Sequence, residues 1–131
     1  KKLFFVEQSE CIDIKQKIKI FPDKTLELDG NMGKLKLSPA NKGNISPEIV
    51  KLGLDVTYRK GGEKIKPIGR KYTHKLKNLF QEKKIYPWMR GKIPILKYRN
   101  ELVCVGNLWV AEKFHKQNGY SLIWSEKPDI N

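Results

Sequence analysis

The chain has 131 residues, with 27 Lys and Arg against 14 Asp and Glu, which gives a formal net charge of +13. That length suits one compact domain. Hydrophobic residues make up 39% of the chain and aromatic residues 10%, which argues against intrinsic disorder. No apolar run approaches the ~18 residues that cross a bilayer, and the N-terminus lacks a secretory signal pattern, so we expect a cytoplasmic protein with no membrane span.

The first part of the chain has the pattern of short strands. An apolar run covers residues 3–6, and isoleucines alternate partly with lysines over residues 14–20, which predicts a half-buried strand with Ile14, Ile18 and Ile20 on one face. Residues 25–28 form the next candidate strand. Asp29-Gly30-Asn31 predicts a hairpin into residues 34–37, where lysines and leucines alternate between a solvated face and a buried face.

A loop and another strand follow. Residues 38–47 contain Pro, Gly, Asn and Ser, which predicts a loop. Residues 54–59 have the alternation of a strand, and we expect Leu54, Val56 and Tyr58 to face inward.

The clearest helix of the sequence follows a pair of turns. Thr73 is a candidate N-cap, because its hydroxyl would accept a hydrogen bond from a free amide at the helix start. Leu76, Leu79 and Phe80 then fall at positions i, i+3 and i+4 and predict one buried stripe. We expect this helix to end near Lys84.

The last part of the chain returns to strands. Residues 86–90 predict a short helical turn or a bend started by proline, and strands are expected at 95–98, 102–105, 108–110 and 120–124. The predicted fold class is α+β: a strand-rich, mostly antiparallel small domain with one main amphipathic helix.

The positive charge is concentrated in one segment. Between Arg59 and Arg99 there are fourteen basic and two acidic residues, a balance of +12, whereas the other 90 residues hold thirteen basic and twelve acidic residues. Lysine-rich surfaces also keep proteins soluble, but a general lysine bias would not spare the flanking segments. We therefore favour a surface that binds a polyanion, above all a nucleic acid.

Several cations of this segment are candidates for phosphate contacts. An arginine binds phosphate with two hydrogen bonds and a lysine acts as a point charge, so we expect the arginines to make the geometrically specific contacts. The start of the predicted helix also favours anions through its free amides. The candidate contacts are Arg59, Lys64, Arg70, Lys71, Lys75, Lys77 and Arg90.

Aromatic side chains lie within the same segment. Tyr72, Tyr86 and Trp88 are candidates for stacking on bases. A tryptophan beside a proline at the end of a helix is more often a core residue, and we expect that role for Trp88.

No catalytic or metal site is evident in the chain. Gly61-Gly62 and Gly69-Arg70-Lys71 lack the spacing of a phosphate-binding loop. His74 and His115 have no carboxylate or cysteine at ligand spacing and are expected at the surface. The two cysteines, Cys11 and Cys104, lie far apart and are predicted to be buried and reduced.

Four motifs follow one another along the chain: Arg59 to Glu63 (Arg-x-Gly-Gly-Glu), Pro67 to Arg70 (Pro-x-Gly-Arg), Lys75 to Glu82 (the helix) and Pro87 to Arg90 (Pro-x-x-Arg). Together and in this order, they resemble the C-terminal domain of bacterial tRNA(Ile)-lysidine synthases. Further similarity lies in residues 93–96, 101–103, 106–110 and 122–124, whereas residues 1–53 fit only loosely. Tyr86 stands where the family commonly has a proline.

The resemblance implies a role in tRNA modification. The family's enzymes use ATP to activate the first anticodon cytidine of an isoleucine tRNA with a CAU anticodon, and lysine then displaces AMP to form lysidine. Catalysis lies in an N-terminal domain with a Ser-Gly-Gly-x-Asp-Ser loop, which this sequence does not contain. ATP and Mg²⁺ would therefore bind the catalytic domain, and this chain would need no cofactor of its own.

By the same resemblance, residues 1–131 form a single C-terminal domain that holds the tRNA, chiefly by its acceptor stem. Residues 1–53 would be a strand-rich entry segment, and residues 54–131 the tRNA-binding core. Glu63 is expected to be an ion-pair partner that organises the cations.

Two other functions remain open from the sequence. A free-standing RNA-binding or ribosome-associated module would have the same basic surface. An adaptor for an acidic protein is the weaker alternative, and it predicts no preference for structured RNA.

Overall fold

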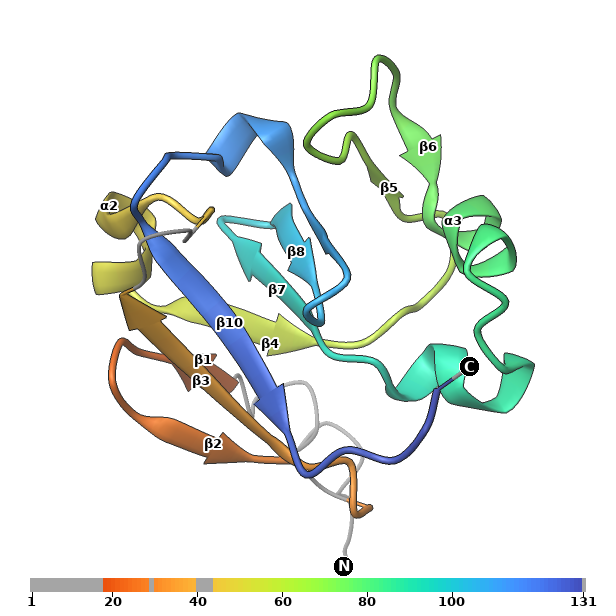
Figure 1. Cartoon of the computed structure of the whole chain (residues 1–131), viewed down its shortest axis with the longest axis horizontal. Helices are drawn as coiled ribbons and strands as arrows, with labels where there is room; N and C mark the ends of the chain where they lie inside the picture. The colour runs from red at the N-terminus through yellow and green to blue at the C-terminus, as the bar shows by residue number, and fades with distance from the viewer. Residues whose placement is uncertain (1–17, 29, 40–43, 131) are drawn as a thin grey trace, which may run out of the picture.

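Two antiparallel sheets form the body of the protein in the computed structural model (Figure 1). The structure describes residues 18–28, 30–39 and 44–130, so the strand expected at 3–6 and Cys11 lie outside the described residues. The larger sheet has the strand order β1-β4-β7-β8-β9. Its strands are β1 (Ile18–Ile20), β4 (Leu54–Thr57), β7 (Ile95–Tyr98), β8 (Glu101–Val105) and β9 (Trp109–Val110).

The second sheet joins distant parts of the chain. Its order is β10-β3-β2, with β2 (Thr25–Glu27) and β3 (Lys34–Pro39) forming the predicted hairpin and β10 (Tyr120–Ser125) pairing with the other edge of β3. Leu35 and Leu37 are fully buried and Lys36 is exposed, which confirms the predicted alternation.

The core lies where the two sheets meet. Trp124 of β10 is buried, and its indole N–H donates to the carbonyl of Met32 over 2.6 Å. Gly106, which follows β8 with a φ of +50°, lies so close to Trp124 that an added Cβ would sit 3.2 Å from the ring. A side chain here would push the sheets apart, because a packed interior has no room for it.

The first half differs from expectation at one helix and two side chains. A short helix, α2 (Pro47–Lys51), follows the predicted loop, shares only Pro47 with it and buries Ile49 and Val50; no element was predicted at residues 48–53. Two apolar residues within five are too few to show a helical period. Ile18 is 46% exposed and Tyr58 37% exposed, although both were expected to face inward. Tyr58 lies just past the end of β4, where the chain leaves the sheet.

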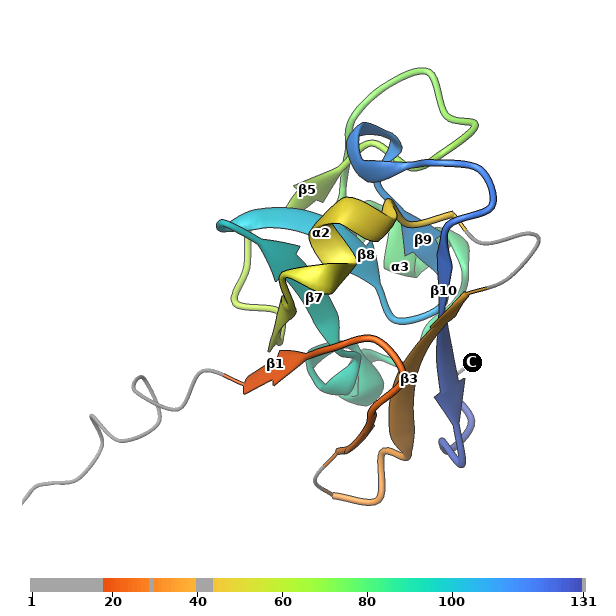
Figure 2. The ribbon, with the colours of Figure 1, turned by 90° about the vertical axis from the view of Figure 1, so that its left-hand side faces the viewer.

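A long excursion separates two neighbouring strands. β4 and β7 pair directly, yet residues 58–94 connect them outside the sheet, along the right-hand side of Figure 1 and on the far side from α2. Figure 2, which views the molecule from the α2 side, shows β5 and α3 behind the sheets. The excursion contains β5 (Lys64–Ile65), β6 (His74–Lys75), α3 (Leu76–Glu82) and the 3₁₀ helix η1 (Pro87–Lys92); a second 3₁₀ helix, η2 (Glu112–Phe114), follows β9.

The main amphipathic helix, α3, anchors the excursion to the core. Leu76, Leu79 and Phe80 are at most 1% exposed, which confirms the predicted stripe. Thr73 is not the cap, because the helix begins only at Leu76, after β6. The Leu76 amide donates instead to the carbonyl of Glu63 over 2.9 Å, a long-range partner that no local pattern reveals.

The lengths of the helices also test the expectation that the chain has no membrane span. None of the helices in the described ranges is long and apolar enough to cross a bilayer.

Candidate nucleic-acid interface

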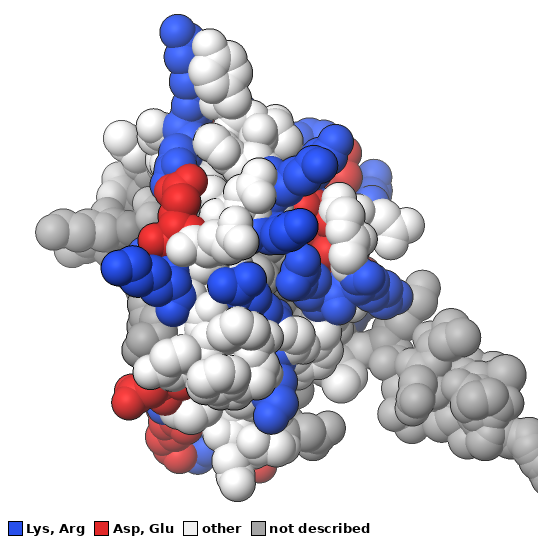
Figure 3. All heavy atoms as spheres, turned by 90° about the vertical axis from the view of Figure 1, so that its right-hand side faces the viewer, with Lys and Arg blue, Asp and Glu red and all other residues white. Residues whose placement is uncertain are grey.

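The excursion between β4 and β7 carries most of the positive charge. Residues 58–94 contain twelve Lys or Arg and two acidic residues, Glu63 and Glu82. Figure 3 shows this side of the molecule, with basic atoms gathered at the height of β5, β6 and α3, above an uncharged area at the height of η1. Function is commonly carried by such connections on a rigid scaffold. We call the surface of residues 58–94 the basic face.

Two lysines face each other on the ribbon of β5 and β6. Lys64 pairs with Lys75 and Ile65 pairs with His74 in the antiparallel register. Ile65 is only 3% exposed, so the ribbon turns that side toward the core and its two lysines toward solvent. Like charges directly opposite each other destabilise a strand pair.

The ribbon is fixed to the body by its backbone. The amide of Ile68 donates to the carbonyl of Val110 over 3.0 Å, and the amide of Glu112 donates to the carbonyl of Lys66 over 2.9 Å. The ammonium of Lys66 also forms a 2.9 Å ion pair with Glu112. The position of the ribbon, and of the lysines that it carries, is therefore fixed relative to the sheets.

Glu63 organises the turn before the ribbon. Its carboxylate accepts hydrogen bonds from the amides of Lys60 over 2.6 Å and Gly61 over 2.9 Å. Partial burial raises the pKa of Glu63, but backbone hydrogen bonds outweigh burial and bring the pKa below its ordinary value. Glu63 thus acts on backbone amides, where the sequence had suggested an ion pair with the cations.

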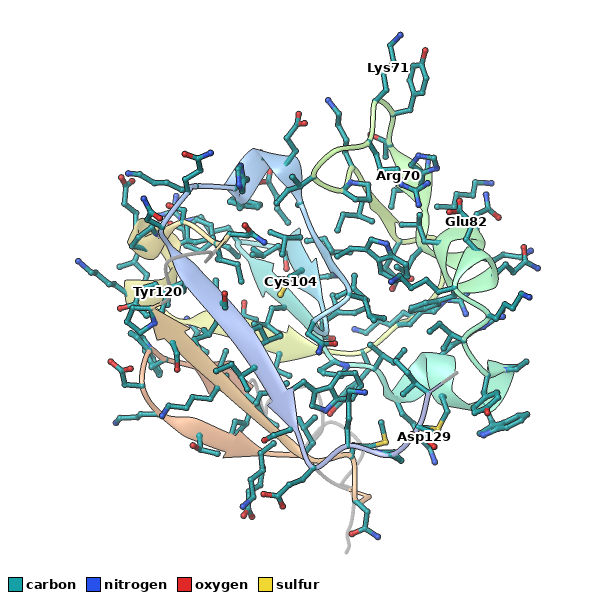
Figure 4. The ribbon with its side chains drawn as sticks, in the orientation of Figure 1. Arg70, Lys71, Glu82, Cys104, Tyr120 and Asp129 are labelled. Atoms are coloured by element: carbon teal, nitrogen blue, oxygen red, sulfur yellow. The ribbon has the colours of Figure 1, made fainter. Side chains whose placement is uncertain are left out.

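Arg70 is already paired within the protein. Its guanidinium donates two hydrogen bonds, of 2.7 and 3.3 Å, to the carboxylate of Glu82 at the end of α3 (Figure 4). The hydrogen bond from Arg70 and its charge lower the pKa of Glu82, and the same pair raises the pKa of Arg70. Arg70 also precedes β6, so it does not sit at the helix start where we expected it.

Arg59 and Arg90 are held as well. Arg59 is half-buried, with its guanidinium carbon 5.9 Å from the centre of the Phe80 ring. Arg90 is half-buried too, and its Nε donates to the carbonyl of Ile85 over 3.0 Å. All three arginines expected to clamp phosphates therefore have structural contacts.

Four predicted lysines remain as exposed cations. Within the ranges that the structure covers, none of them has an acidic partner in an ion pair. Lys71 lies at the outer end of the β5–β6 connection and points away from the body, 5.8 Å from the Tyr72 ring and well before α3 (Figure 4). The four are Lys64, Lys71, Lys75 and Lys77.

Trp88 is exposed, so its expected place in the core is wrong. It lies in η1 with 67% of its surface exposed, and its ring stacks on the ring of Tyr86 with 4.8 Å between centroids and 11° between planes. Pro87 starts η1 at this point and turns the Trp88 side chain outward, whereas Met89 is the buried residue.

The other sequence expectations concern histidine and metal chemistry. His74 and His115 are half-buried, and no group of three metal-ligating side chains occurs in the part of the chain that is described. Sequence reasoning missed the two glutamates that pair with Lys66 and Arg70. They lie 46 and 12 residues away from their partners, and no motif connects them.

Comparisons with known proteins agree with one another. The family model described as "TilS substrate C-terminal domain" matches residues 54–124. A tRNA(Ile)-lysidine synthase of Vibrio cholerae is 34% identical over 84% of this chain and 25% of its own length. One of Vibrio campbellii is 37% identical over 78% of this chain and 23% of its own length. The chain thus spans about a quarter of these relatives or less.

A solved structure shares the fold. It is titled "Crystal structure of TILS C-terminal domain", and it aligns with a TM-score of 0.64 and 23% identity over 83% of this chain and 95% of its own. This confirms the strand-rich, mostly antiparallel α+β class with one main amphipathic helix.

Proposed function

This chain belongs to the TilS substrate C-terminal domain family, and from that premise we propose that it is the part of a tRNA(Ile)-lysidine synthase that holds the tRNA. The basic face would grip the acceptor stem. Because A-form helices are recognised mostly through their phosphates and shape, a broad group of lysines suits this task.

The proposal extends to the enzyme of which the chain would be a part. That enzyme would ligate lysine to the first anticodon cytidine of isoleucine tRNA with the anticodon CAU, using ATP, in the cytoplasm. ATP and Mg²⁺ would bind a catalytic N-terminal domain with a Ser-Gly-Gly-x-Asp-Ser loop, and residues 1–131 alone would be inactive. Residues 1–53 would lead into the tRNA-binding core at 54–131.

The observation that carries the tRNA-binding role is the pairing of Lys64 with Lys75. The two lysines face each other on the β5–β6 ribbon, and both are exposed. Their repulsion costs stability, and an anion between or above them would remove that cost. A phosphate backbone supplies such anions at regular spacing.

We rank the candidate contacts by their exposure and by the partners that they already have. Lys64, Lys71, Lys75 and Lys77 are the first choices for phosphates, because their ammonium groups are exposed. Arg59, Arg70 and Arg90 would act mainly by holding the basic face in shape, through their contacts with Phe80, Glu82 and Ile85.

The test is a charge reversal on the ribbon. Lys64→Glu combined with Lys75→Glu should weaken binding of isoleucine tRNA and of an acceptor-stem minihelix about tenfold or more, without lowering the free energy of unfolding. The matched control is Lys24→Glu with Lys36→Glu, which makes the same change of charge away from the basic face. Both lysines are exposed: Lys36 is in β3, and Lys24 directly precedes β2. It should reduce affinity far less.

Two results would contradict the proposal. One is a wild-type chain that binds neither RNA, or that binds a DNA duplex of equal charge as tightly as both RNAs. The other is a control variant that loses as much affinity as the ribbon variant, because the charge would then act without a defined site.

A further inference from the structure

A pair of stacked aromatic rings lies on the surface at η1, within the basic face. Trp88 is 67% exposed and Tyr86 is 37% exposed, and their rings stack at 4.8 Å with 11° between the planes. The other two tryptophans of the chain, Trp109 and Trp124, are 8% and 5% exposed. A tryptophan so exposed forgoes the burial that usually makes this residue stabilising.

The backbone that carries the two rings is held on both sides. The Tyr86 amide donates to the carbonyl of Ile130 over 2.8 Å, and the Met89 amide donates back to the carbonyl of Tyr86 over 2.9 Å. Pro87, at the first position of η1, restricts φ between the two aromatic residues. Met89 is buried, which fixes η1 to the core. The backbone that carries the two rings is therefore fixed to the body of the protein.

The neighbouring charges favour a nucleic acid over an apolar protein surface. Lys84 and Lys92 are exposed lysines that flank the two rings in the sequence, and residues 83–92 contain no acidic residue. Two further cations of this segment have other contacts: Lys83 lies 5.8 Å from the centre of the Trp109 ring, and Arg90 donates to the carbonyl of Ile85. Flat aromatic rings among cations are the combination that binds single bases and their phosphates. Stacking is available to every base, because every base has a π-face.

We propose that the Tyr86–Trp88 pair is a platform for a base at the open end of a bound RNA stem. This rests on the proposed function, in which the lysines of the ribbon hold the phosphates of that stem. Inside a duplex both faces of each base are covered by its neighbours. Only the last base pair, or an unpaired nucleotide next to it, has a face that Trp88 can cover.

The experiment compares three RNAs that share one stem. The first ends in a blunt base pair, the second carries unpaired 3′ nucleotides, and the third is closed at both ends by tight loops. Trp88→Ala should weaken binding to an open-ended RNA about tenfold and leave the closed RNA unchanged. The two open-ended RNAs distinguish between two occupants of the platform. If the variant loses affinity for the blunt stem, the occupant is the last base pair; if it loses affinity only for the extended stem, the occupant is an unpaired nucleotide.

The matched variant is Trp88→Phe, which keeps an aromatic face and should keep most of the affinity. Equal losses on open and closed RNAs, or no loss on any RNA, would overturn the platform. The ribbon variant Lys64→Glu/Lys75→Glu should weaken binding to all three RNAs, the closed one included. A ribbon effect without a Trp88 effect therefore refutes the platform alone, and a wild-type chain that binds no RNA refutes both proposals.

Tryptophan fluorescence gives a second readout. Because the other two tryptophans are buried, stacking on Trp88 should quench the exposed component of the emission when an open-ended stem saturates the protein. The closed stem should leave the emission unchanged. Unaltered emission with a saturating open-ended stem would also refute the platform. Equal melting temperatures of wild type and Trp88→Ala would show that the exposed ring has no structural role.

Discussion

A single carboxylate shapes the turn at the entry to the basic face. Glu63 accepts hydrogen bonds from two backbone amides through its side chain, and its own carbonyl accepts from the first amide of α3. One residue thus links the turn at Lys60 and Gly61 to the start of the helix. The carboxylate of Glu63 is bonded to backbone amides, and among the described residues it forms no ion pair with a lysine. It lowers the net charge of the basic face by one but neutralises none of the exposed lysines.

We expect Glu63→Ala to lower the free energy of unfolding by about 1 kcal/mol at pH 7, because hydrogen bonds to a charged acceptor are lost from a partly exposed turn. The pKa of Glu63 is lowered in the folded state, so its contribution is full above its ordinary pKa and disappears as the pH falls through the folded value. Urea unfolding at neutral and acidic pH measures the difference. A gap between wild type and variant that persists at pH 2 would contradict this role.

At Cys104 burial outweighs hydrogen bonding, so the net shift of the pKa is opposite to that of Glu63. The thiol is fully buried in β8, and burial raises its pKa to about 12. Since the thiolate is the reactive form, Cys104 should not react with a thiol reagent at pH 8 until the protein unfolds. The measurement uses a Cys11→Ser variant, which leaves Cys104 as the single cysteine. Rapid labelling of the folded variant would contradict the expected burial.

At the scale of elements, α3 connects the basic face to the core. Phe80 is fully buried, and the centroid of its ring lies 5.8 Å from that of the Trp109 ring. Phe80→Ala should cost about 3–5 kcal/mol of unfolding free energy, because the cavity adds to the lost burial. Asn78→Ala, at an exposed position of the same helix, should change it by less than about 0.5 kcal/mol. Comparable losses in the two variants would mean that α3 is not held by its apolar stripe.

Elements with a clear period were predictable from the sequence, and elements set by distant contacts were not. The alternation at Leu35 and Leu37 and the stripe of α3 appear as expected. The start of α3 was misplaced because its first amide bonds to Glu63, thirteen residues earlier. The orientation of Trp88 was wrong for a related reason. Its neighbour Met89 fills the core position, and a single turn of helix has no period that distinguishes the two.

At the scale of the whole molecule, the charge count located the basic segment of the chain but did not indicate which of its cations are exposed and unpaired. The sequence distinguishes the arginines from the lysines between Arg59 and Arg99 by their chemistry, but it does not show which of them are already paired within the protein. The fold pairs Lys66 with Glu112 and Arg70 with Glu82, and it leaves Lys64 and its neighbours on the ribbon exposed. Which cations are paired depends on which glutamates the tertiary structure brings close to them, and these distances cannot be predicted from the sequence alone.

The division into paired and exposed cations predicts the salt dependence of binding. If Lys64, Lys71, Lys75 and Lys77 each neutralise one phosphate, the logarithm of the association constant should fall with the logarithm of salt concentration with a slope of about −3 to −4. The double variant at Lys64 and Lys75 should reduce the slope by about 2. Titrations of the minihelix at several salt concentrations measure both. A slope near −10 would mean that many more cations take part.

The pairing of β3 with β10 also has a consequence for how the chain is made. Tyr120 pairs with Pro39, and eighty residues, 40–119, separate the two strands. At ~5–20 residues per second, a ribosome needs about 4–16 seconds to produce that separation. During this time β3 has only β2 beside it, and Leu35 and Leu37 lack the cover that β10 provides. Until β10 has been made, β3 therefore has one edge without a partner strand, and such edges are prone to pair with other chains.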